Sequence, residues 1–445
     1  MDDEGYVPFV ARTTGGSVPL TAATAITSAM STTTAVPTTT TPTTLMASRP
    51  ADTFRNVREV TKANPRYSSI RDAGEHDLAL AGKEMSSRDQ RLAVDRYEGG
   101  MVFEKVFSFE HLFNAACACC NNVRWKASTQ LFENAILEWV ANTRRQLLDG
   151  SYKSKGFNSF YIMERGKLRH IQSVHISERM VQKCLVQYCL RPLIQPRLIV
   201  DNCATLPGRG TDYAINRLKE HLSWWYLRHG RDGYIDIMDY HDYFNSILHE
   251  KLLVMYALLP MDSRLFNLVK YFIDCFDGDS GLGLGSEISQ ISAVFYTNEI
   301  DHMIKDKYGF HCYGRYMDDS YIIGSQDDIS DVKIELKRKL ADFGLKMNEK
   351  VTTTVPLTQG FHYLKKRFFI SESGKIITRL ERKNVKRERR RLKKNIELIN
   401  SGLMGLDSEA SSWESWKSYA TKYNSYRTVQ SVYYDRMRLL KPYLQ

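Results

Sequence analysis

A Tyr-Met-Asp-Asp stretch at residues 316–319 constrains this chain more than any other feature of its sequence. The flanking residues 311–315 and 320–324 are rich in types that favour β-strands. The arrangement predicts a tight hairpin that carries Asp318 and Asp319 at its tip. Aspartate is a common turn residue, so such a pair can also be a solvated loop. Two adjacent carboxylates are, however, hard oxygen ligands suited to Mg²⁺, which makes the hairpin a candidate metal site.

A third carboxylate lies upstream, at the end of a second short apolar run. Residues 234–238 are followed directly by Asp239 and Tyr240, and then by Phe244. An aspartate followed by an apolar residue, variable positions and an aromatic pair resembles the first catalytic motif of reverse transcriptases. Together with residues 316–319 it supplies three acids. Two strands that each end at an acid can bring these carboxylates to one pair of Mg²⁺ ions.

The resemblance implies an α/β (α+β) right-hand polymerase with helix-rich fingers, an antiparallel-sheet palm and a helical thumb. Its reaction would be template-directed DNA synthesis. Asp239, Asp318 and Asp319 would hold two Mg²⁺ ions, with Mn²⁺ as a substitute, and the carbonyl of Tyr240 would be a further ligand. Phe244 would be a steric gate that clashes with a ribose 2′-hydroxyl and so favours dNTPs.

A second hairpin is predicted at residues 160–171, with its turn at residues 164–166. Lys167 and Arg169 leave the turn on the same strand face, because side chains in a strand alternate with period two. The fingers of reverse transcriptases present basic side chains to the incoming triphosphate in this way. The resemblance therefore implies substrate binding by Lys167 and Arg169. It implies a contact with the same polyanion or the template for Arg179, whose alternative is a surface charge on a helix.

A glycine-rich stretch at residues 281–285 is followed by apolar residues at helical spacing. Such a stretch lets backbone amides approach a nucleotide or template above a supporting helix, although the glycine pattern alone also occurs in ordinary loops. It resembles the segment in which a glutamine, here Gln290, touches the templating pair. The Ser289-Gln290 form resembles diversity-generating retroelement enzymes and some phage-defence relatives more than group II intron enzymes.

Three further segments extend the resemblance. Residues 206–215 resemble a Gly-x-Gly-Thr turn that enters a helix, where free amides could receive a backbone phosphate. Residues 343–352 resemble the segment that bears a lysine near the leaving phosphates, with Lys350 as the closer match and Lys346 as the alternative. Residues 359–370 resemble the primer-grip hairpin.

Lysine and arginine total 62 against 51 acidic residues, a formal net charge of +11, and the excess is concentrated at residues 375–394. An apolar stripe through and beyond this segment predicts a basic amphipathic helix. The stripe consists of Val385, Leu392, Ile396 and Ile399. Few acids interrupt the charge, which favours a thumb helix that follows a phosphate backbone over a solvated face or a membrane-surface helix. The arginines of this helix assigned to nucleic-acid binding are Arg387, Arg390 and Arg391.

The resemblance covers about residues 104–440, and the predicted organisation has five parts. They are a disordered Thr/Ser/Pro-rich tail at residues 1–50, a weakly structured lead-in at 51–103, fingers at 104–230, a palm at 231–372 and a basic helical thumb at 373–445. The tail composition cannot bury enough apolar surface to offset its ordering entropy. No window approaches the ~18 uninterrupted apolar residues of a membrane span.

Eight cysteines without a secretory signal indicate reduced thiols in a cytoplasm. With the resemblance, the expected location is the cytoplasm, for a bacterial or phage-encoded protein. Cys117, Cys119 and Cys120 form the one cluster. Since no second ligand pair follows at a suitable spacing, the cluster favours helix packing over zinc binding.

The biological setting has several interpretations. The first is a bacterial or phage-encoded enzyme of a diversity-generating retroelement, and the second is a retron-like or phage-defence reverse transcriptase. A non-enzymatic RNA-binding scaffold is the alternative from a different class, although no catalytic acid is lost. The expected partners are an RNA template, a DNA or RNA primer, dNTPs and a small accessory protein, with no membrane. Because the chain stops after the thumb segment, we expect no maturase extension or endonuclease, which argues against a self-sufficient intron enzyme.

Overall fold

The computed structural model describes residues 101–164 and 166–443 of the chain. The tail predicted for residues 1–50 and most of the lead-in predicted for residues 51–103 lie outside the described residues. The same holds for Arg165 in the turn of the predicted fingers hairpin and for the side chain of Lys167.

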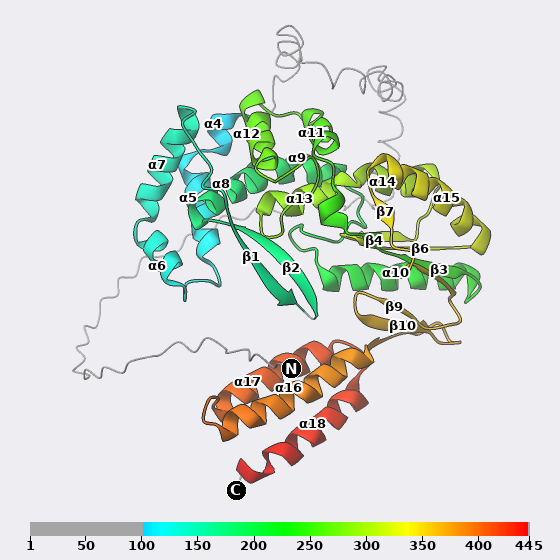
Figure 1. Ribbon diagram of the computed structural model, residues 1–445. Coiled ribbons are helices and arrows are strands. Elements are labelled where there is room, and N and C mark those ends of the chain that lie inside the picture. The colour runs from blue at the N-terminus through cyan, green and yellow to red at the C-terminus, as the bar shows by residue number, and fades with distance from the viewer. Residues whose placement is uncertain (1–100, 165, 444–445) are drawn as a thin grey trace, which may run out of the picture. The chain divides into compact units, whose positions relative to one another are not determined.

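The first part of the described chain is helical apart from one hairpin, β1–β2, that projects from the helices (Figure 1). Glu164 pairs with Lys167, so the turn contains two residues and the predicted hairpin is confirmed. The elements are α4 (Phe103–Val106), α5 (Phe109–Cys120), α6 (Ala127–Asn134), α7 (Ile136–Leu148), β1 (Phe157–Glu164), β2 (Lys167–Val174), α8 (Ile176–Leu185), η2 (Val186–Leu190), α9 (Arg191–Ile194), η3 (Gln195–Arg197) and α10 (Thr211–His229).

A four-stranded antiparallel sheet follows, in the order β5-β6-β3-β8. Its strands are β3 (Tyr234–Met238), β5 (Tyr313–Tyr316), β6 (Asp319–Gly324) and β8 (Thr353–Pro356). Strand β3 carries apolar side chains on both faces, and both faces are covered. Ile235 belongs to a core that includes Leu218 and Leu222 of α10, whereas Met238 belongs to the core on the opposite face. Two buried faces hold the ends of β3 and β6 in a defined place.

Further helices that contribute to the core around Met238 lie between β3 and β8 in the chain. They are η4 (Tyr243–Ser246), α11 (His249–Ala257), α12 (Ser263–Asp274), α13 (Glu287–Tyr296), α14 (Asn298–His302), η5 (Met303–Lys307) and α15 (Gln326–Asp342). A short pair formed by β4 (Tyr240–His241) and β7 (Lys346–Met347) connects the end of the β3 segment to the chain after α15. None of the helices in the described part of the chain is both long and apolar enough to cross a membrane.

The last part of the described chain is a three-stranded sheet followed by three helices (Figure 1). The elements are β9 (Phe361–Tyr363), β10 (Lys366–Ile370), β11 (Ile376–Leu380), α16 (Arg382–Asn400), α17 (Leu406–Thr421), α18 (Tyr426–Leu440) and η6 (Lys441–Tyr443). Leu392 of the predicted apolar stripe is buried in one core with Trp413, Trp416 and Val432, so α16 packs on α17 and α18 through that stripe.

The mixture of a helix-rich first part, an antiparallel sheet and a helical end confirms the α/β (α+β) class. The domain boundaries at residues 104, 231 and 373 stay predictions. Cys119 and Cys120 are buried in α5, as expected for packing residues, whereas Cys117 of the same cluster is only partly buried.

Candidate active site

The two adjacent acids lie where the sequence predicts them, at the turn between β5 and β6. Tyr316 pairs with Asp319, so Met317 and Asp318 form a two-residue loop. Met317 has a φ of 57°, the left-handed region that supports tight hairpins but that bulky side chains rarely adopt. The predicted hairpin is confirmed, and its turn is held in an unusual backbone conformation.

Strand pairing brings the third acid to the same place. Met238 of β3 pairs with Ser320 of β6, so in this antiparallel pair the next residues outward, Asp239 and Asp319, face one another. Burial, and then the charges of Asp318 and Asp239, raise the pKa of Asp319 to about 7. The three carboxylates therefore share one electrostatic environment.

Asn348 fixes Asp239 from the segment after β7. Its side-chain amide donates to Oδ2 of Asp239 at 2.7 Å, and its backbone N–H donates to the Asp239 carbonyl at 2.8 Å. From this segment the sequence singled out Lys350 and Lys346, but both are exposed and neither lines a described cavity, whereas Asn348 does. The one sequence signal for Asn348 is its position between those two lysines.

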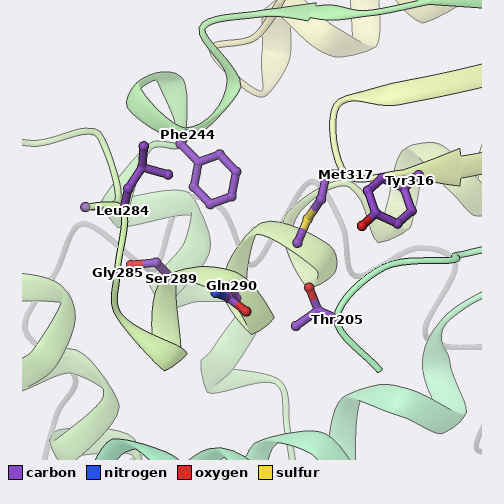
Figure 2. A pocket seen from close by; sticks show the side chains of 9 residues that line it. Thr205, Phe244, Leu284, Gly285, Ser289, Gln290, Tyr316 and Met317 are labelled. Atoms are coloured by element: carbon purple, nitrogen blue, oxygen red, sulfur yellow. The ribbon is translucent and has the colours of Figure 1, made fainter. Parts of the chain in front are cut away.

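Two neighbouring cavities share Phe244 and the glycine-rich loop, and the larger of them lies at the acids. The larger, of about 630 Å³, is lined by Asp239 and Asp318 together with residues of β2 and η4. The smaller, of about 350 Å³, is bordered by Tyr316 and Met317 at the hairpin turn (Figure 2). Its lining includes Thr205, Phe244, Ser289, Gln290, Tyr316 and Met317.

Phe244 stands between the two cavities. Figure 2 shows its ring between Leu284 and Met317, with Gln290 below it. The Phe244 carbonyl accepts a hydrogen bond from the Leu282 N–H at 2.9 Å, so the backbone of this aromatic residue is tied to the glycine-rich loop. The ring therefore projects from a fixed backbone into the space beside the acids.

The glycine-rich loop is also tied to the fingers hairpin. The Gln172 N–H of β2 donates to the Leu284 carbonyl at 3.0 Å. A Cβ on Gly283 would lie 2.2 Å from Oε1 of Gln172 and 2.8 Å from the Phe276 ring, so only glycine permits this approach. Sequence reasoning missed Gln172, because nothing local marks it as the partner of a loop that follows much later in the chain.

The basic side chains expected at the substrate occupy different surroundings. Arg169 lines the larger cavity, and its guanidinium pairs with Glu164 at 2.7 Å with both side chains nearly half exposed. Arg179 donates to Oγ of Ser173 at 3.3 Å from the first turns of α8. The side chain of Tyr240 is buried, so a ligand in the cavity could reach only its backbone.

The assigned arginines of α16 also differ from one another. Arg387 and Arg390 are exposed. Arg391 is half-buried and donates to Glu388 at 2.8 Å and to the Ser412 carbonyl at 2.9 Å. The Arg391 guanidinium is therefore engaged within the helical bundle.

The acids fit a divalent cation that completes its shell with other oxygens. Within residues 101–164 and 166–443, no three His, Cys, Asp or Glu side chains are placed to hold a metal ion on their own. Mg²⁺ is usually bound through one or two carboxylates and keeps waters and substrate phosphates as its remaining ligands. Asp239 and Asp318 on one cavity, with Asp319 beside them, provide such a donor set.

Residues 154–367 match the family model described as "Reverse transcriptase (RNA-dependent DNA polymerase)". The chain carries a reverse transcriptase domain. The matched range includes the β1–β2 hairpin, the four-stranded sheet and all three acids. The observed architecture is that of a right-hand polymerase. Enzymes with this domain generally depend on a divalent metal ion.

Two solved structures show a low similarity to this chain. One is apo telomerase from Candida tropicalis, with 14% identity and a TM-score of 0.40 over 54% of this chain and 51% of that chain. The other is the same telomerase truncated from its C-terminal domain, with 14% identity and a TM-score of 0.39 over 50% of this chain and 54% of that chain. The chain thus spans about half the length of either structure. No curated protein matches the sequence.

We predict that divalent-cation binding strengthens as the pH rises through about 7, the pKa of folded Asp319. Its ordinary pKa is 3.8, so between these values the folded protein holds a proton that the unfolded chain has lost, and stability falls as the pH rises. A cation binds the deprotonated carboxylate, so the increase in Tm caused by Mg²⁺ should grow between about pH 6 and pH 8.

Thermal denaturation with and without Mg²⁺ measures this effect. Asp319→Asn should remove most of the pH dependence, because its amide does not titrate. An Asp319→Asn protein whose Mg²⁺-induced Tm increase grows with pH as steeply as in the wild type would contradict the prediction.

Proposed function

We propose that the protein is an RNA-directed DNA polymerase that makes cDNA from an RNA template by two-metal nucleotidyl transfer. The observation that carries this proposal is the meeting of Asp239, Asp318 and Asp319 at one end of β3 and β6. They meet inside a reverse transcriptase domain and beside a cavity of about 630 Å³.

Each side chain of the site has a proposed task in this reaction. Asp239 and Asp318 would hold two Mg²⁺ ions, or Mn²⁺, with Asp319 as a weaker ligand and the carbonyl of Tyr240 as a further one. When bound, the ions supply activation of the primer 3′-hydroxyl and stabilisation of the departing pyrophosphate. Asn348 orients the carboxylate of Asp239 through one side-chain hydrogen bond and holds the Asp239 backbone through a second.

The substrate contacts are proposed for residues around the cavities. Arg169 and Lys167 of β2 would neutralise the triphosphate, and Gln290 would support the nascent base pair. Phe244 would exclude the ribose 2′-hydroxyl. Lys350 remains the proposed lysine near the leaving phosphates, although its exposed position means that it would act only on a bound substrate that extends out of the cavity.

The proposed biological role is in a diversity-generating retroelement of a bacterium or phage, which the Ser289-Gln290 form supports. A retron-like or phage-defence role is the alternative. A cytoplasmic location and a small accessory protein belong to the same proposal. Retention of all three acids disfavours a non-enzymatic RNA-binding scaffold.

Primer extension by the purified full chain tests the activity. An RNA template annealed to a DNA primer, with dNTPs and Mg²⁺, should yield DNA whose sequence follows the template and whose synthesis stops on chelation of the metal. A template treated with ribonuclease before the reaction is the matched control. Tight RNA binding without extension under any of several priming arrangements would instead favour the scaffold.

We predict that exposed arginines of α16 contact nucleic-acid phosphates. Replacing Arg387 and Arg390 with glutamine should weaken primer–template binding for every sequence and reduce the slope of log affinity against log salt by up to about 0.9 per lost contact. Arg391 is left unchanged because its guanidinium donates to Glu388 and to the Ser412 carbonyl, so its replacement would also change contacts within the bundle.

A salt titration of wild type and double variant on one RNA–DNA hybrid measures the slopes. Lys270→Gln combined with Lys337→Gln is the charge-matched control, since both lysines are half exposed and lie on α12 and α15. Equal slopes for the two double variants would show that α16 presents only a solvated face.

A further inference from the structure

A fully buried ion pair lies directly behind the acidic turn. Arg315 and Asp301 are both 0% exposed, and their side chains meet in a two-pronged contact: Nε donates to Oδ1 at 2.8 Å and Nη2 donates to Oδ2 at 2.7 Å. Tyr313 adds a hydrogen bond from its hydroxyl to Oδ1 of Asp301 at 2.6 Å. Buried charges are costly unless they are paired and fully hydrogen-bonded, and here Asp301 is anchored from two sides.

The rest of the Arg315 guanidinium reaches two backbone carbonyls. Nη2 donates to the carbonyl of Val294 in α13 at 2.9 Å. Nη1 donates to the carbonyl of Met317, inside the turn, at 3.1 Å. One planar group thus joins α13, α14 and the loop that carries Asp318, a fork geometry that arginine has and lysine lacks.

The backbone of Arg315 is fixed as well. Its N–H donates to the Asp201 carbonyl at 3.0 Å, and its carbonyl accepts from the Cys203 N–H at 2.8 Å. The residue can therefore not follow the turn if the turn relaxes. Because other partners hold both the backbone and the guanidinium of Arg315, its hydrogen bond to the Met317 carbonyl restrains the turn and does not move Arg315.

Met317 is the residue that needs such a restraint. A left-handed backbone conformation is less favourable in free energy for a residue that has a side chain than for glycine. Met317 adopts this conformation, with a φ of 57°. The Met317 carbonyl belongs to the peptide group that leads into Asp318. Its orientation sets the direction in which Asp318 leaves the backbone.

We propose that Arg315 is a positioning residue, which uses its pair with Asp301 to hold the Met317 carbonyl, keep the turn left-handed and aim Asp318 into the cavity. The kinetic consequence rests on the proposed polymerase function, whereas the restraint on the turn does not. A merely structural ion pair would add stability without acting on the turn.

The test is a double-mutant cycle between Arg315→Lys and Met317→Gly. Lysine keeps a charge beside Asp301 but its single ammonium cannot also span both carbonyls, so kcat should fall about tenfold while KM for dNTP stays nearly unchanged. Glycine adopts the left-handed turn unaided. The loss caused by Arg315→Lys should therefore be much smaller when Met317→Gly is also present. Asp301→Asn keeps the shape of the Asp301 side chain but removes the charge that pairs with Arg315. The loss of kcat that it causes should also be smaller when Met317→Gly is present.

The wild type, both single variants and the double variant are also compared by the Tm increase that Mg²⁺ causes. This measurement needs no polymerase activity. Absence of DNA synthesis in the wild type, with coupling still present in the Mg²⁺ readout, would count against the proposed function and support the positioning role. Equal effects of Arg315→Lys with and without Met317→Gly in both readouts would overturn the positioning role, and the ion pair would then be structural.

Discussion

Replacing Asp318 by asparagine is expected to abolish dNTP incorporation on an RNA template, while the protein stays folded and still binds RNA. Asparagine has nearly the same shape as aspartate but lacks the charge that holds a divalent cation. Asp318 lies in the loop between β5 and β6, so the core does not depend on it. We expect kcat to fall on the order of a thousandfold or more, as when a group essential to the chemical step is removed.

Asp239→Asn should have a similar effect, and Asp319→Asn a smaller one. The reason is that burial and the charges of its neighbours raise the pKa of Asp319 to about 7, so its carboxyl group is already partly protonated near neutral pH. Asp331→Asn is the matched control, since Asp331 is an exposed residue of α15. Primer extension, Tm and RNA affinity are measured on all four variants. Extension at the wild-type rate by Asp239→Asn or Asp318→Asn would remove these acids from the mechanism.

The second large effect is expected at Phe244. Its ring lines both cavities, so truncation to alanine should open the space beside the acids to a ribose 2′-hydroxyl. We expect the ratio of kcat/KM for rNTP to that for dNTP to rise about 10- to 200-fold, the range in which a misfit of one small group in an enclosed pocket discriminates. The dNTP rate should fall somewhat, because the sugar loses a contact.

Phe266→Ala is the control for this substitution. Phe266 is a partly buried phenylalanine of α12 that packs on the same core without lining either cavity. Single-nucleotide insertion of matched rNTP and dNTP gives the ratio for both variants. A ratio that changes no more in Phe244→Ala than in Phe266→Ala would place the gate at another residue.

Local patterns were sufficient for the parts of the site built from neighbours in sequence. The β1–β2 and β5–β6 hairpins follow from short strand-forming runs joined by two residues, and the structure confirms both. The apolar stripe of α16 likewise predicts the side that packs on the bundle. Such features depend on periodicity and turn chemistry within a few residues.

Residues that act through distant partners escaped the same reasoning. Asn348 is an ordinary polar residue until β4 and β7 pair and bring it against Asp239, which lies 109 positions earlier. Lys350, from the same segment, was the sequence candidate, but its side chain is exposed outside both cavities. Arg391 has the same charge as Arg390 in the sequence, yet its guanidinium is engaged inside the bundle.

The sequence by itself determined the three acids, the hairpin that presents Asp318 and Asp319 and the kind of enzyme domain that they indicate, because these features are recorded in residue type and short-range spacing. Only the tertiary structure decided which side chains support the acids. Arg315 resembles any strand arginine until the folded core excludes water around it and leaves Asp301, Val294 and Met317 as its partners. Burial and strand register set those contacts, and neither is a property of a short stretch of chain.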